Sequence, residues 1–471
     1  MSDAIRQAVE LYGGAVSLVP GGIELNDASK LQSEATDEVV WRAVFGTEEE
    51  RAAARWLLWE LGQITGARPA SIQGLYEARG RGECGGFTVP AINVRMMAYD
   101  TARAVFRAAK AGKAAAILLE IARSEISYTG QRPAEYVAVI QGAALREGYS
   151  APLFIQGDHC QVNLKKYLAG DGDEVGEVKT LVAEEIAAGF YNIDIDTSTL
   201  VDLTRDTLEA QQRDNYERCA EITESIRAVE PDGVTVSVGG EIGEVGQKNS
   251  TVEELHAFMK GYQAALRQRG SFTGISKISV QTGTSHGGVV LPDGSIAEVN
   301  IDIDTLADLA RVAREEYGLA GAVQHGASTL PSNAFGNFPR VEVCEIHLAT
   351  NFQSMVFDHP RFPADLKQRM YAHIDENLAG ERKESDSEEQ FYYKTRKKTI
   401  APFKQEVWSL PADVRSAIAA DLESTFRFLF EQLNVNGTID LVDRYIRAPV
   451  QHRETVQQAV AMAADDPDAG E

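Results

Sequence analysis

The feature that most constrains the fold of this chain is an eightfold alternation between about residues 85 and 350. Eight short apolar runs, rich in branched side chains, are each followed by a longer stretch with helical spacing. The runs cover residues 87–94, 115–121, 152–159, 191–197, 235–243, 275–282, 320–326 and 343–350. Such near-continuous apolar runs are typical of strands that are buried on both faces. The alternation predicts an α/β fold with a parallel sheet closed as a (β/α)₈ TIM barrel, and an open doubly wound sheet is the alternative.

Two segments outside this alternation are predicted to extend the barrel. Residues 47–65 have helical spacing and contribute to a helical N-terminal extension over residues 1–70. The barrel is assigned to residues 71–365. Residues 366–471 form a C-terminal extension, in which the charged run 380–399 is interpreted as a solvated loop and residues 413–435 as a long amphipathic helix.

Charge and composition exclude several classes of partner. The chain has 70 Asp and Glu against 46 Lys and Arg, a formal net charge of −24, which argues against nucleic acid and anionic membrane surfaces. Each apolar run is shorter than the roughly 20 residues of a membrane helix. The four cysteines form no CxxC pair, and residues 1–14 lack the pattern of a signal peptide. We therefore expect a cytoplasmic protein.

Three of the eight histidines lie where predicted strands end, at His159, His286 and His325. The carboxyl ends of parallel barrel strands meet at one rim, which is the catalytic face of this fold. Asp196 and Glu241 lie near the ends of two further strands. Imidazoles combined with carboxylates suit Zn²⁺ or another divalent cation, and three protein ligands leave a coordination position open for a substrate. The sequence therefore predicts a catalytic metal site.

Glycines follow two of these histidines and indicate a phosphate site. Gly287 follows His286, and Gly326 with Ser328 follows His325. A residue without Cβ lets a ligand approach the backbone closely, and clustered amides suit an anion. These loops follow the sixth and seventh predicted strands, close to where barrels of this type often bind a phosphate.

Taken together, these motifs resemble class II, zinc-dependent fructose- and tagatose-bisphosphate aldolases over about residues 75–355, with this chain as a divergent member. The motifs, in order, are GFTVPAINV, PLFIQGDHC, IDTS, EIG, QTGTSHGG, QHGAS and IHLAT. A shorter segment, YTGQRPAEY, looks like part of the companion, non-catalytic subunit of tagatose-bisphosphate aldolase.

The resemblance implies a role for each matched residue. His159, His286 and His325 match zinc ligands, and Asp158 matches the acid/base carboxylate. Asp196 and Glu241 match acidic residues at secondary metal positions. The residues that match substrate, phosphate and monovalent-cation contacts are Asn93, Gly287, Gly326, Ser328 and Thr350. Because adjacent residues of a strand point to opposite faces, Asp158 and His159 share a site only if the strand bends, and Gly157 favours such a bend.

The chain also departs from the family pattern. His347 and Ala349 stand where the family usually has an asparagine and an aspartate, so we expect altered donor recognition, with His347 among the substrate-binding residues. A carboxylate that usually follows Glu241 is missing from the stretch GQKNST, with Glu244 and Glu120 as candidate replacements. A neighbouring chain could also donate a basic residue to a distal phosphate of the substrate. The candidates for this residue are Arg396, Lys397, Lys398 and Arg444.

These assignments predict a metal-dependent aldolase that reversibly cleaves a ketose phosphate or related sugar derivative. Cleavage beside a ketone leaves an enediolate, which a divalent cation stabilises, and Asp158 removes the proton of the far hydroxyl. Two alternatives remain open. One is an accessory subunit without activity, and the other is a metal-dependent epimerase or isomerase that shares the enediolate. The resemblance further implies a homo-oligomer, dimer or tetramer, that pairs through terminal helices.

Overall fold

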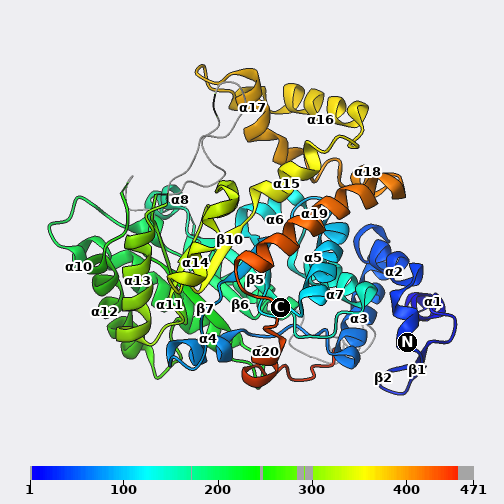
Figure 1. Cartoon of the computed structure of the whole chain (residues 1–471), viewed down its shortest axis with the longest axis horizontal. Helices are drawn as coiled ribbons and strands as arrows, with labels where there is room; N and C mark the ends of the chain where they lie inside the picture. The colour runs from blue at the N-terminus through cyan, green and yellow to red at the C-terminus, as the bar shows by residue number, and fades with distance from the viewer. Residues whose placement is uncertain (1–2, 171, 244–247, 284–290, 292–300, 455–471) are drawn as a thin grey trace.

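Eight parallel strands close into a barrel in the computed structural model of this chain, which describes residues 3–170, 172–243, 248–283, 291 and 301–454 (Figure 1). Each strand pairs with its neighbours in sequence, and the last pairs with the first. The strands are β3 (Val89–Asn93), β4 (Leu118–Ala122), β5 (Phe154–Gln161), β6 (Asn192–Asp196), β7 (Ser237–Glu241), β8 (Lys277–Val280), β9 (Ala322–Gln324) and β10 (Glu345–Leu348). Each falls within or overlaps one of the eight predicted runs, so the predicted TIM barrel is confirmed.

Helices connect successive strands on the outside of the barrel. They are α5 (Ala98–Gly112), α6 (Arg123–Thr129), α7 (Pro133–Glu147), α8 (Leu164–Ala169), α9 (Glu174–Ala188), η2 (Ser198–Leu200), α10 (Leu208–Gln211), α11 (Arg213–Val229), α12 (Val252–Arg269), α13 (Ile303–Tyr317), η3 (Ala327–Thr329), η4 (Ser332–Ala334) and α14 (Asn337–Arg340). Local chemistry sets their ends. The Thr251 hydroxyl and Glu254 carboxylate cap the first turn of α12 reciprocally, and Gly148 ends α7 in the left-handed conformation.

The N-terminal extension contains a small hairpin in addition to the predicted helices. It comprises α1 (Asp3–Glu10), β1 (Val16–Val19), β2 (Gly22–Leu25), η1 (Ala28–Gln32), α2 (Glu34–Phe45) and α3 (Glu48–Thr65), and α4 (Gln73–Gly80) follows. The two antiparallel strands are joined by Pro20 and Gly21, and Gly21 takes a positive φ of 86° that glycine adopts without strain. The extension packs beside α7 of the barrel (Figure 1).

The C-terminal extension is helical over most of its described length. The helix α15 (Thr350–Phe357) precedes it, within the range assigned to the barrel. The extension itself comprises α16 (Ala364–Asn377), η5 (Ala379–Glu381), α17 (Glu388–Thr395), η6 (Arg396–Thr399), α18 (Lys404–Trp408), α19 (Ala412–Gln432) and α20 (Ile439–Tyr445). The predicted long amphipathic helix is α19, which packs along α5. The solvated-loop interpretation is wrong over residues 388–399, which form α17 and η6 because Ser387 and Gln390 build a capping box and Phe391 is buried.

We call residues 385–399 the cap, because six of them line the cavity described below. Figure 1 shows α16 and α17 projecting from the barrel beyond α15. After α20 the chain returns to α3, where the Trp59 indole donates a hydrogen bond to the Gln451 carbonyl at 2.6 Å. None of the described helices is long and apolar enough to cross a membrane.

Candidate active site

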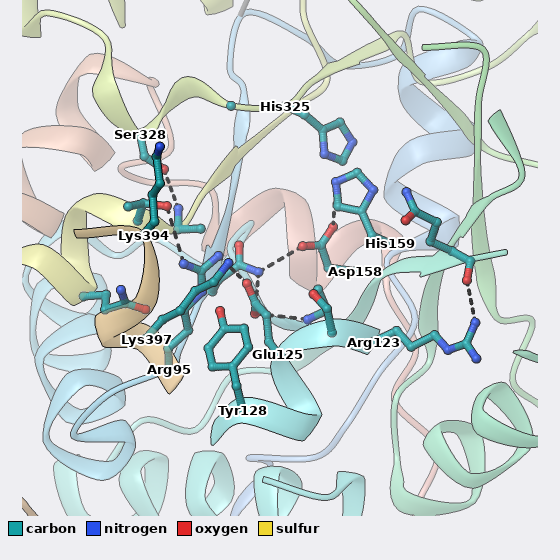
Figure 2. A pocket seen from close by; sticks show the side chains of 18 of the residues that line it. Arg95, Arg123, Glu125, Tyr128, Asp158, His159, His325, Ser328, Lys394 and Lys397 are labelled. Atoms are coloured by element: carbon teal, nitrogen blue, oxygen red, sulfur yellow. Dashed lines mark hydrogen bonds and ion pairs between the residues drawn. The ribbon is translucent and has the colours of Figure 1, made fainter. Parts of the chain in front are cut away.

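A cavity of about 990 Å³ opens at the carboxyl ends of the barrel strands. Its lining comes from the ends of β3, β4, β5 and β10, from the residue after β9, from α6 and from the cap. In Figure 2 the rings of His159 and His325 lie on one side of the cavity, and Arg95, Lys394 and Lys397 lie on the other. The cavity therefore extends from the predicted metal site to a side lined by Arg95, Lys394 and Lys397, which we call the basic wall.

A bend in β5 lets two adjacent residues face this cavity. The register between β5 and β6 shifts between Gly157 and Cys160, and His159 has a positive φ of 41°. Residues other than glycine rarely adopt this backbone conformation, and those that do are concentrated at functional sites. Asp158 and His159 both line the cavity as a result. The predicted bend is confirmed, but the left-handed residue is His159 rather than Gly157.

His159, Glu241 and His325 form a group that fits a divalent cation. One ligand atom from each lies within 4.8 Å of the others, and the two imidazole ring centroids are 4.3 Å apart. Two imidazole nitrogens and one carboxylate are a donor set that Zn²⁺ accepts. Burial and the Asp196 charge raise the pKa of Glu241 to about 8, and the neighbouring His159 opposes this shift. His286 and Gly287, the other predicted members of this region, lie outside the described residues.

Asp196 lies behind His159 and orients its ring. The Asp196 Oδ2 atom is 3.2 Å from His159 Nδ1, and its Oδ1 accepts hydrogen bonds from the backbone and hydroxyl of Ser198. The same Nδ1 atom lies 3.5 Å from Glu241 Oε2, and carboxylates that contact a metal-binding imidazole fix the orientation of its ring. Among the described residues, Asp196 does not join the ligand group, so its position suits a supporting role.

Asp158 is a buried carboxylate beside the metal-ligand group. Its Oδ2 accepts a hydrogen bond from the Asn93 side chain at 2.9 Å, and its Oδ1 lies 3.2 Å from His347 Nδ1. Burial opposes ionisation, but the charges of His159 and His347 hold the pKa of Asp158 well below its usual value. Asp158 is therefore held in its ionised form.

The other predicted substrate contacts that the structure describes also line the cavity. These residues are Asn93, Gly326, Ser328, His347 and Thr350. The Ser328 hydroxyl accepts a hydrogen bond from the Ala349 amide at 2.6 Å, which brings the loops after β9 and β10 together.

Sequence reasoning missed Arg95, which is 3.4 Å from the Thr350 hydroxyl, and Tyr128 of α6. Because Arg95 follows the first barrel strand, its place at the carboxyl rim was a usable signal.

Most basic residues of the cavity already have an acidic partner. The ion pairs are Arg95 with Glu125, Arg123 with Glu174, Lys166 with Glu177 and Lys394 with Asp386. The Lys397 ammonium has no hydrogen-bond or ion-pair partner among the described residues and lies 5.3 Å from the centre of the Tyr128 ring. Burial and the nearby Arg95 charge lower the pKa of Lys397. An anion in the cavity would satisfy this half-buried ammonium.

The four candidates for binding a distal phosphate differ in their partners and in whether they line the cavity. Arg396 pairs with Asp358 at 2.8 Å, and Lys398 pairs with Glu381 at 2.6 Å. Arg444 stacks on Tyr445, and neither residue lines the cavity. Lys397 alone of the four lines the cavity, and it comes from the same chain.

Of the two candidate replacements for the missing carboxylate, the structure describes only Glu120, which does not line the cavity. Glu244 lies outside the described residues. Glu120 is fully buried below the cavity floor, 3.1 Å from His347 Nδ1. In the stretch that lacks the carboxylate, Lys248 pairs with Glu254 and Asn249 donates to Asp302, away from the cavity.

Comparison with known proteins places the chain in a family. The family model for class-II fructose-bisphosphate aldolase matches residues 78–410. No curated protein matches. A solved structure described as a probable tagatose 6 phosphate kinase from Sinorhizobium meliloti is 17% identical, with 80% of this chain and 98% of that chain covered and a TM-score of 0.51.

Two further solved structures are similar to this chain. The fructuronate-tagaturonate epimerase UxaE from Cohnella laeviribosi is 14% identical, with 90% of each chain covered and a TM-score of 0.50. A fructose-bisphosphate aldolase from Campylobacter jejuni is 16% identical, with 79% of this chain and 98% of that chain covered and a TM-score of 0.46. With the family model matching from the start of the barrel to beyond the cap, the chain belongs to the class-II fructose-bisphosphate aldolase family.

Proposed function

We propose that this protein is a metal-dependent aldolase that reversibly cleaves a ketose phosphate or a related sugar derivative. Family membership supports lyase chemistry. The observation that carries the proposal is that ligand atoms of His159, Glu241 and His325 lie within 4.8 Å of one another, and that His159, His325 and the Asp158 carboxylate line the cavity. A Lewis acid combined with a base is one combination that achieves carbon–carbon cleavage next to a ketone.

His159, Glu241 and His325 would hold the divalent cation, with His286 added by the family resemblance. The cation, with Zn²⁺ as our assignment, supplies Lewis-acid stabilisation of the negative charge that develops at the substrate carbonyl. Asp196 fixes the orientation of His159 through its Nδ1 atom. The residues of this chain thereby pre-organise the site before substrate arrives.

Asp158 is the acid/base in this proposal. It takes the proton from the hydroxyl on the far carbon of the breaking bond, so that this carbon becomes the aldehyde carbon and the electron pair of the bond remains on the carbon beside the carbonyl. In condensation Asp158 returns the proton to the new hydroxyl. The Asn93 amide, which donates to Asp158 Oδ2 at 2.9 Å and to Glu125 Oε2 at 3.0 Å, keeps the carboxylate at the cavity wall.

The basic wall supports an anionic substrate. Lys397 has no acidic partner among the residues described, and Arg95 lies against Thr350 of the predicted phosphate loop. Taking an ammonium out of water is costly unless an anion compensates it. A phosphate on the ketose meets this need, and a carboxylate of a sugar acid has the same chemistry.

The test is a screen of ketose phosphates for aldehyde release, with and without a chelator. We expect cleavage that is lost on chelation, restored by Zn²⁺ or another divalent cation, and abolished by Asp158→Asn without loss of bound metal. His256→Asn, on α12 away from the cavity, is the matched control and should retain full activity. Full activity in metal-free protein would refute the proposal.

The same screen separates the two alternatives. A single rearranged sugar in place of two fragments identifies an epimerase or isomerase. Turnover that appears only after a catalytic partner is added identifies an accessory subunit.

A further inference from the structure

Charged side chains fill the barrel interior beneath Asp158, where barrels of this type usually carry branched aliphatic layers. Glu120, Asp194, Lys277 and Glu345 are each at most 5% exposed and come from four different strands. Lys277 Nζ lies 2.5 Å from Glu345 Oε1 and 2.9 Å from Asp194 Oδ1. Because burying ions is costly, and apolar packing fills such a core at no such cost, this network calls for a functional reason.

His347 connects this network to Asp158. Its Nδ1 atom is 3.2 Å from Asp158 Oδ1 and 3.1 Å from Glu120 Oε1, and its Nε2 atom is 2.7 Å from Glu345 Oε1. Both ring nitrogens therefore face carboxylate oxygens. Asp158, His325 and His347 are close enough to group around an ion, but binding one would cost His347 one of these bonds.

Glu345 is in turn fixed from below. Its Oε1 atom accepts hydrogen bonds from Lys277 and from the Gln156 amide at 2.9 Å, and its Oε2 atom accepts one from the Tyr76 hydroxyl. Glu345, Tyr76 and Lys277 are all 1% exposed or less. The carboxylate that holds His347 thus has little freedom to move.

Asp158 itself lies beside the left-handed residue of the β5 bend, and both of its oxygens are engaged. Asn93 donates to Oδ2, and His347 faces Oδ1. Two donors on the two oxygens set the plane of the carboxylate. If His347 is removed, Asp158 keeps the Asn93 hydrogen bond and a longer ion pair of Oδ1 with His159 Nε2 at 3.9 Å, which hold the plane of the carboxylate less tightly.

We propose that His347 is a positioning residue, which holds Asp158 in the orientation for proton transfer and is itself held by the Glu345–Lys277 pair. The inference rests on the proposed function only in assigning the proton transfer to Asp158. It assigns a different role from the substrate contact expected from the sequence, because both nitrogens of His347 already have partners within the barrel.

Kinetics of His347→Asn and His347→Gly test this role. We expect kcat to fall about 10- to 100-fold while KM changes less than about threefold, because the substrate contacts remain and the base is misaligned. Added imidazole should restore kcat of His347→Gly along a saturation curve. His256→Gly, whose ring contacts Tyr317 on another face, is the control and should gain nothing from imidazole. A raised KM with unchanged kcat would mean that His347 binds substrate and would overturn the inference.

A double-mutant cycle tests whether Glu345 acts through His347. Glu345→Gln keeps an acceptor oxygen toward the imidazole and should lower kcat less than His347→Asn does. Because the two residues form one chain, the double variant should be no slower than His347→Asn alone. Additive losses in kcat would show that Glu345 acts independently.

Crystal structures decide the point without turnover. In His347→Gly the Asp158 carboxylate should occupy more than one orientation, and soaking with imidazole should restore a single one. An Asp158 that keeps its orientation in the variant would overturn the inference, even if wild type cleaves ketose phosphates. Conversely, absence of cleavage by wild type refutes the proposed function and leaves this structural test intact.

Discussion

Replacing Lys397 by methionine removes the charge that the cavity leaves without an acidic partner. Methionine keeps most of the apolar stem and gives up only the ammonium, which lies 5.3 Å from the centre of the Tyr128 ring, so packing of the cap should change little. If the ammonium binds an anionic group of the substrate, the variant should bind that substrate more weakly. It should still perform the chemistry, because Asp158 and the metal-ligand group are untouched.

The size of the effect follows from the surroundings of Lys397. At an effective dielectric constant of about 20, opposite charges 4 Å apart attract by about 4 kcal/mol before desolvation is counted. Hydrogen bonds to charged groups contribute about 1.5–3 kcal/mol net. Since 1.4 kcal/mol is a factor of ten, KM should rise about 10- to 100-fold with kcat within about threefold of wild type.

Steady-state kinetics with a phosphorylated ketose measure this change, and Lys398→Met provides the matched control. Lys398 is one residue away but pairs with Glu381 outside the cavity, so its variant should keep the wild-type KM. The unphosphorylated sugar should show no difference between Lys397→Met and wild type. Equal KM values for the two methionine variants, or an equal loss with the unphosphorylated sugar, would refute the reasoning.

Two further predictions concern the metal and pH. Asp196→Asn should lower the affinity for the divalent cation roughly 10- to 100-fold by releasing the His159 ring, as titration of metal-free protein would show, and unchanged affinity would contradict this. Burial raises the pKa of Glu185 to about 8 from an unfolded value of 4.5, so the folded state binds a proton that the unfolded chain lacks between these values. The wild-type free energy of unfolding should therefore fall as pH rises from about 4.5 to 8, by an amount on the order of a few kcal/mol that Glu185→Gln removes. Parallel urea titrations of the two proteins measure the difference, and parallel pH profiles would exclude the effect.

The barrel could be predicted because its strands are buried on both faces and therefore appear as continuous apolar runs. The β1–β2 hairpin was not predicted because its strands are only four residues long, too short to show a clear alternation, and Pro20 and Gly21 at the turn are the main signal. The helix α17 was not predicted because charged residues dominate its composition. Its local signal was the Ser387 and Gln390 capping box, with Phe391 as the anchoring apolar residue.

The site was predictable to the extent that parallel strands bring their carboxyl ends together. This rule placed His159, His325 and Glu241 near one another without knowledge of any contact. It could not reveal the ion pairs under the floor, because a charged residue inside an apolar run is read as an interruption. Lys277 in ISKISV and Glu345 in VCEIHL were such interruptions, and they are partners across the barrel.

The cap has a consequence for how active units are counted. The sequence allows a basic residue from a neighbouring chain to bind a distal phosphate of the substrate. In the structure, Lys394 and Lys397 line the cavity from the same polypeptide as Asp158 and His159. We therefore expect no recovery of activity when a variant of the cap is mixed with a variant of the metal-ligand group. With respect to these residues, each molecule works or fails alone, whatever assembly it joins.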